Sequence, residues 1–160
     1  LLLEAGADVS LVDADASTAL HHALRCDSVE TAKLLIVAGS DLNAKDAGGA
    51  TPTLLTMTPS LVGMSEVFSM LLQRGVDVNA VDKKGMHLVH VAVNRGKFAY
   101  LEALLKAGAE PDAKNSDGHT PLILAILMPE KRDEVDVNVA NSGDVEMVDA
   151  LIEAGADTAA

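Results

Sequence analysis

The feature that most constrains this chain is a short phrase that recurs along it, in which a glycine is followed two residues later by an acidic residue. The glycines are Gly6, Gly39, Gly75, Gly108 and Gly155, at intervals of 33, 36, 33 and 47 residues. The base period is therefore 33 residues, with insertions of 3 and 14. A period of this length is typical of repeat proteins, whose units bury their apolar faces by stacking on one another.

Each unit is predicted to be a pair of antiparallel helices. A Thr-Pro step such as Thr51-Pro52 is a helix start, since the hydroxyl caps free backbone N–H groups and proline suits the first helical position. The recurring glycine suits a helix end, where it closes the last turn in the left-handed conformation. In the first unit, the apolar spacing predicts helices over Ala19–Arg25 and Val29–Val37, separated by Asp27-Ser28. The polar stretch after each glycine is predicted to form a hairpin-like finger.

These phrases resemble the ankyrin repeat, whose unit reads Asp-x-x-Gly-x-Thr-Pro-Leu-His-x-Ala, then Gly-x-x-Glu, then Leu-Leu-x-x-Gly-Ala-Asp. The first unit supplies Asp13, Thr18, Leu20, His21, Ala23, Glu30, Leu34, Leu35 and Gly39, and the third supplies Asp82, Gly85, His90, Ala92, Gly96, Leu104, Leu105 and Gly108. The resemblance implies an all-α ankyrin-repeat solenoid of stacked helix–turn–helix units with fingers. We predict one array over 1–160: a partial repeat 1–12, repeat 1 over 13–45, repeat 2 over 46–81, repeat 3 over 82–114, and repeat 4 over 115–160 with an inserted loop at 129–142.

Several positions depart from the repeat pattern. Ala16 stands where the finger glycine is expected, which predicts a distorted turn. Thr53 puts a polar residue at a core position, and the extra residues of repeat 2 fall around Thr58-Pro59-Ser60. His21 and His90 occupy the motif histidine, for which the resemblance implies hydrogen bonds that brace the next repeat. Neither end carries a polar capping repeat, so we expect an excerpt from a longer array.

The composition of the chain restricts the kinds of partner that it can bind. Hydrophobic residues make up 49% of the chain but aromatic residues only 2%, so the core must be aliphatic. The net charge of −12 repels nucleic-acid phosphates and anionic membrane surfaces, and the apolar run Leu122–Met128 is too short to span a bilayer. A single cysteine, Cys26, allows no internal disulfide and favours a reducing, cytoplasmic location. We expect a monomer within its array that binds a protein or peptide, with no nucleic acid and no membrane insertion.

No catalytic, cofactor or metal site is predicted. His87 and His90 lie three residues apart on one predicted helix, but no further ligand lies near them in register. The acidic pair Asp13 and Asp15 suits a solvated turn, and Cys26 has no candidate base in its sequence context. The chain is therefore interpreted as a protein-interaction scaffold and not an enzyme. The alternative is the regulatory ankyrin region of a larger enzyme, channel or lipid-binding protein whose activity lies outside this chain.

The resemblance places a partner on the concave surface made of finger tips and first helices. In repeats 1 and 2 this surface is small or polar, with Ala14, Asp15, Ser17, Arg25, Cys26, Ala47, Gly48 and Ala50. In repeats 3 and 4 it contains a basic island, which is unusual in so acidic a chain and favours a partner with acidic character. The predicted partner-binding residues are Lys83, Lys84, Met86, Asn94, Arg95, Lys114, Ser116, Asp117 and His119.

Three positions are candidates for covalent change. Asn79, and more weakly Asn43, end finger sequences that resemble those accepted by asparagine β-hydroxylases, although asparagine also suits such turns for its hydrogen bonding alone. Asp136 ends Asp133-Glu134-Val135-Asp136, which resembles the tetrapeptide that executioner caspases recognise. The surrounding charged loop is predicted to be mobile, unless its alternating valines dock on the repeat.

Overall fold

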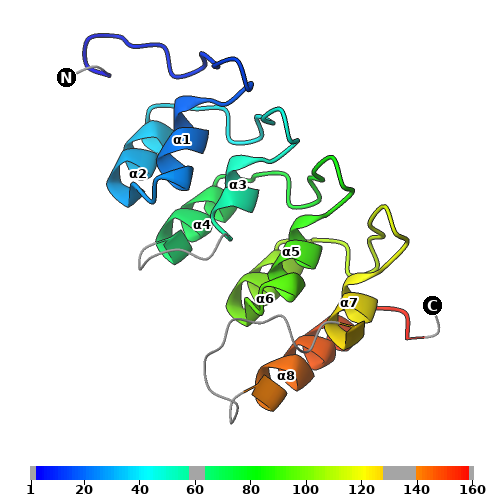
Figure 1. The fold of residues 1–160 in the computed structure, drawn as a ribbon. Coiled ribbons are helices and arrows are strands. Elements are labelled where there is room, and N and C mark those ends of the chain that lie inside the picture. The colour runs from blue at the N-terminus through cyan, green and yellow to red at the C-terminus, as the bar shows by residue number, and fades with distance from the viewer. Residues whose placement is uncertain (1–2, 58–63, 128–139, 159–160) are drawn as a thin grey trace. The chain divides into compact units, whose positions relative to one another are not determined.

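A computed structural model describes residues 3–57, 64–127 and 140–158, with side chains omitted at 140–144. The chain divides into two compact units, Leu1–Asp77 and Val78–Ala160. Each unit holds two pairs of helices, and the regular elements of the described residues are all helical apart from two isolated β-bridges (Figure 1). This confirms the all-α prediction.

The first unit contains α1 (Ala19–Arg25), α2 (Val29–Val37), α3 (Pro52–Leu55) and α4 (Met64–Gln73). Helix α1 packs against α2 and α3, and α2 packs against α4. The bounds of α1 and α2 agree with the sequence prediction. Their buried residues form an aliphatic core with those of α4: Leu20, Ala23, Leu24, Ala32, Leu35, Ile36, Met64, Val67, Leu71 and Val76.

The second unit contains α5 (Leu88–Asn94), α6 (Phe98–Lys106), α7 (Pro121–Leu127) and α8 (Ala140–Glu153). Helix α5 packs against α6 and α7, and α8 packs against α6 and α7. Helix α8 begins at Ala140, so residues 140–142 of the predicted loop 129–142 are helical. That loop's remaining residues, Asp136 among them, and the extra residues 58–60 lie outside the described part of the chain.

The residues predicted to begin and end helices make the capping contacts expected of them. Thr18, Thr51 and Thr120 each accept a backbone N–H three residues ahead, at 3.4, 3.4 and 3.3 Å. After α2, Gly39 adopts φ +90°, a left-handed conformation that glycine takes without the steric cost of a Cβ. Local chemistry thus marks the starts of α1, α3 and α7 and the end of α2.

The motif histidines link successive repeats. His21 accepts the Thr18 N–H at its Nδ1 (3.2 Å), and its Nε2 lies 3.1 Å from the carbonyl oxygen of Ala50 on the next finger. His90 repeats the arrangement, with its Nε2 3.0 Å from the His119 carbonyl oxygen. Both imidazoles are fully buried. The bracing role implied by the resemblance is confirmed.

The fingers are tight turns organised by one side chain each. Asp13, Asp46, Asp82 and Asn115 all accept backbone N–H groups two and four residues ahead through Oδ1, at 2.8–3.0 Å. The predicted distortion at Ala16 is wrong. Ala16 itself takes the left-handed conformation (φ +54°) and donates to the Asp13 carbonyl at 3.0 Å, as Gly85 donates to that of Asp82.

Candidate functional site

The predicted partner surface is built on the two fingers of the second unit, which lie against each other. The Ser116 N–H donates to the Lys84 carbonyl at 3.4 Å. Gly85 makes this approach possible, because a Cβ there would stand 2.8 Å from the Ser116 nitrogen and Gly85 has φ +68°. The contact brings Lys83 and Lys84 beside the finger that carries Ser116 and Asp117.

The nine predicted residues all reach the surface to some degree. Lys83, Lys84, Arg95, Lys114, Ser116 and Asp117 are exposed, whereas Met86, Asn94 and His119 are half-buried. Met86 is joined to the neighbouring finger, since the Asn115 Nδ2 lies 3.7 Å from its sulfur. Arg95 caps the opposite end of α5, about 10 Å of helix from the finger. The described contacts thus bring the finger residues together but leave Arg95 at the far edge of this surface.

The cations of this surface are unpaired. Lys83, Lys84, Arg95 and Lys114 make no ion pair with an acidic side chain in the described part of the chain. Elsewhere Lys33 lies 2.7 Å from Glu66 and 3.1 Å from Glu30. The basic island therefore keeps its charge available to a partner.

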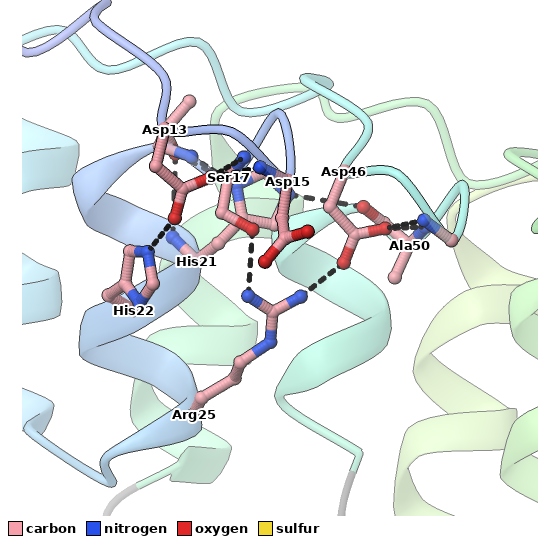
Figure 2. Close-up of polar contacts among 10 residues, drawn as sticks. Asp13, Asp15, Ser17, His21, His22, Arg25, Asp46 and Ala50 are labelled. Atoms are coloured by element: carbon pink, nitrogen blue, oxygen red, sulfur yellow. Dashed lines mark hydrogen bonds and ion pairs between the residues drawn. The ribbon is translucent and has the colours of Figure 1, made fainter.

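On the corresponding surface of the first unit, the arginine and a histidine contact acidic side chains of the fingers (Figure 2). Arg25 donates to the Ser17 hydroxyl at 2.8 Å and forms an ion pair with Asp46 on the next finger. His22 lies 2.7 Å from Asp13. The Ser17 N–H and the His22 ring, both bonded to the Asp13 carboxylate, lower its pKa. Sequence reasoning missed the Arg25 bridge, whose only signal was an arginine at the end of a first helix and an aspartate opening the following finger.

The two candidate asparagines have structural partners. The Asn43 Oδ1 accepts the Asp77 N–H and the Asn79 Oδ1 accepts the Glu110 N–H, each at 2.9 Å. Each asparagine therefore ties one finger stem to the next. Hydroxylation of Asn79 or Asn43 stays a prediction.

A groove of about 610 Å³ borders the first unit's α1 and α2, and exposed Cys26 and His22 lie on its rim with Leu34. In repeat register, its exposed residues Ala19 and Thr31 correspond to the buried Pro52 and Val67 of the next repeat. The groove therefore lies at positions that are buried between repeats elsewhere in the chain, and we assign it no ligand. No group of three or more His, Cys, Asp or Glu residues within the described ranges is placed to hold a metal ion.

Stacked helix pairs with hydrogen-bonded fingers and a polar, partly charged finger surface define a repeat scaffold. Family models agree with that class: one described as "Ankyrin repeats (many copies)" matches residues 71–125, and "Ankyrin repeat" matches 15–47 and 117–160. The chain belongs to the ankyrin-repeat family. No helix in the described ranges is long and apolar enough to cross a membrane.

The sequence of the chain is also similar to those of several named proteins. The chain is 31% identical over 150 residues to "Putative palmitoyltransferase ZDHHC13" of Danio rerio, a match that covers 87% of this chain and 23% of that protein. It is 37% identical over 125 residues to "Neurogenic locus notch homolog protein 1" of Homo sapiens (78% and 5%). It is also 33% identical over 126 residues to the human "SH3 and multiple ankyrin repeat domains protein 2" (79% and 7%). The chain therefore spans less than a quarter of each of these relatives.

Proposed function

We propose that this chain is a protein-interaction scaffold that binds a protein or peptide of acidic character on the finger and first-helix surface of its second unit. The unpaired cations Lys83, Lys84, Arg95 and Lys114 carry this proposal, because they stand in a protein of net charge −12. Met86 adds half-buried apolar surface beside them. The proposed mode of action is binding and not catalysis, by a monomer in a reducing, cytoplasmic compartment, with neither nucleic acid nor membrane as the partner.

The test uses fluorescence anisotropy with a labelled peptide of alternating glutamate and leucine. A glutamine–leucine peptide of the same length is the uncharged control. Replacing Lys83, Lys84 and Arg95 together by Glu should weaken binding of the glutamate peptide at least about tenfold, since three attractive charges become repulsive. Circular dichroism should show unchanged helicity, because exposed residues contribute little to stability.

A matched control separates this surface from net charge. Replacing Lys33, Lys97 and Lys106 by Glu changes the charge equally at α2, at the start of α6 and within α6, and should weaken binding less than about threefold. Equal loss in both variants, or equal affinity of the wild type for the glutamate and glutamine peptides, would contradict the proposed surface.

A second function is favoured by one relative. The similarity to a protein named as a palmitoyltransferase covers 87% of this chain but 23% of that protein. This supports the alternative that the chain is the regulatory ankyrin region of a larger enzyme, channel or lipid-binding protein. Deleting these repeats from the intact protein should then change an activity that resides in other domains, whereas a pure scaffold would lose only partner binding.

A further inference from the structure

Three histidines cluster between α5 and the two fingers of the second unit, beside the unpaired lysines. The ring centroids of His87 and His90 are 5.3 Å apart, and the His90 Nε2 lies 3.0 Å from the carbonyl oxygen of His119 on the next finger. His87 and His119 are half-buried, whereas His90 is fully buried. Histidine is the side chain whose charge ordinarily changes between about pH 5 and pH 8. The surface proposed to bind an acidic partner therefore contains groups that can gain positive charge.

His90 is the fixed centre of this cluster. Its Nδ1 accepts the His87 N–H at 3.2 Å, and its Nε2 donates to the His119 carbonyl. A second proton on this ring would remove the acceptor of the His87 N–H. Burial lowers the pKa of His90, and positive charge on His87 or His119 lowers it further. His90 therefore favours the neutral ring and holds the other two residues in place.

The rings of His87 and His119 can each take up a proton without losing a contact. The His87 Nδ1 lies 3.2 Å from the Gly85 carbonyl oxygen, and because a carbonyl only accepts, this nitrogen carries the hydrogen and Nε2 is the basic atom. His119 makes its finger contacts through its backbone, which donates to the Asn115 Oδ1 and accepts from His90. Within the described ranges, neither the His87 Nε2 nor the His119 ring has a hydrogen-bond partner.

This arrangement is particular to the second unit. In the other repeats the position of His87 is occupied by a threonine, whose hydroxyl does not change charge in this pH range: Thr18, Thr51 and Thr120. In the first unit the ring of His22 already lies 2.7 Å from the Asp13 carboxylate. A proton-dependent charge without an acidic neighbour of its own is therefore expected only on the fingers of the second unit.

The charged groups around His87 and His119 come from the fingers themselves. They are Lys83, Lys84 and Lys114, with the carboxylates of Asp82 and Asp117. Of the two helices packed against α5, α7 carries no charged side chain, and on α6 Glu102 pairs with Lys106. Carboxylates of a bound partner would be added to this set, and an opposite charge nearby favours the protonated form of a histidine.

We infer that binding of the acidic partner is coupled to proton uptake by His87 and His119, so that affinity rises as the pH falls below neutrality. This inference rests on the proposed function and deepens it, because it names a condition that regulates the same surface. The partner's carboxylates stabilise the charged histidines, so the complex holds more protons than the free components, and a lower pH favours the complex. The gain ends near about pH 4.3, where glutamates of the partner take up protons themselves.

The test measures the Kd of the glutamate–leucine peptide by anisotropy at about pH 7.5 and about pH 6, at constant ionic strength. Affinity of the wild type should rise at least about threefold at the lower pH. With His87→Thr and His119→Gln together, the change should be less than about 1.5-fold. Threonine is the residue of the other repeats at this position, and circular dichroism at both pH values checks that the fold is kept. The matched control His22→Gln, in the first unit, should keep the pH dependence of the wild type.

A second measurement counts the protons directly. Isothermal titration calorimetry at about pH 6.5 in two buffers of different ionisation enthalpy should show proton uptake by the wild type, and each single variant, His87→Thr or His119→Gln, should remove part of it. If the wild type takes up no protons, or its affinity is equal at both pH values, the inference is wrong. It is also wrong if the folded double variant keeps the wild-type pH dependence. The proposed function would then still stand if the Lys83, Lys84 and Arg95 variant has lost binding.

Discussion

At the scale of single residues, the motif histidine His90 is a buried connector between repeats. Its Nδ1 accepts the His87 N–H at 3.2 Å, so its Nε2 is the protonated atom and donates to the His119 carbonyl. Burial lowers the pKa of this imidazole, with nearby His87 acting in the same direction. The folded state thus favours neutral His90, and the link depends on the ring staying neutral.

The lowered pKa of His90 predicts a pH dependence of stability. Below the usual histidine pKa of about 6.5, the unfolded chain binds a proton that folded His90 resists, so the contribution of His90 is full above that pH and declines as the pH falls. Urea unfolding at about pH 7.5 and about pH 5 should show a larger loss for the wild type than for His90→Gln. Equal losses would show that His90 does not resist protonation.

The left-handed Ala16 predicts a stabilising substitution. A residue with a Cβ is destabilised by about 1 kcal/mol or more in this conformation. Glycine avoids that strain, but its greater conformational freedom in the unfolded chain offsets part of the gain. Ala16→Gly should therefore raise the free energy of unfolding by about 0.5 kcal/mol. Ala14→Gly, in the same exposed turn without a positive φ, should not raise it. Thermal or urea unfolding of both variants checks the difference, and a gain in both would remove the conformational explanation.

At the scale of helices and fingers, the sequence predicts the features that are determined by residues close together in the chain. The bounds of α1 and α2 follow from Thr18, Gly39 and the apolar spacing between them. Helix α8 begins within the predicted loop 129–142, because no capping residue in the sequence marks Ala140 as a helix start. The Arg25–Asp46 bridge joins two residues that lie 21 positions apart in the sequence. Such pairs depend on how one finger rests on the next, which sequence spacing alone does not determine.

The unequal burial of residues along α2 predicts that substitutions on this helix lower the free energy of unfolding by different amounts. Ile36 is fully buried in the core, whereas Leu34 is 61% exposed. Ile36→Ala should lower the free energy of unfolding by about 2–5 kcal/mol, since it leaves a cavity in a packed interior. Leu34→Ala should lower it by less than about 0.5 kcal/mol. Urea unfolding measures both, and similar costs would mean that Leu34 is also covered in solution.

At the scale of the whole molecule, two units with the same backbone plan present different surfaces. In the first unit, Arg25 forms an ion pair with Asp46, and the His22 ring contacts the Asp13 carboxylate. Among the described residues of the second unit, Lys83, Lys84 and Lys114 have no acidic partner, and the Asn94 Oδ1 has no donor. The shared fold provides the scaffold, and the side chains that vary between repeats determine where an acidic partner binds.

The most direct test is an NMR titration of the isotopically labelled chain with the glutamate–leucine peptide. We expect backbone amide signals to shift at 82–95 and 114–119, over the fingers, α5 and their margins. The equivalent signals at 13–26 and 45–50 in the first unit should stay in place. Shifts concentrated in the first unit, or on α6 and α8 without the fingers, would contradict it.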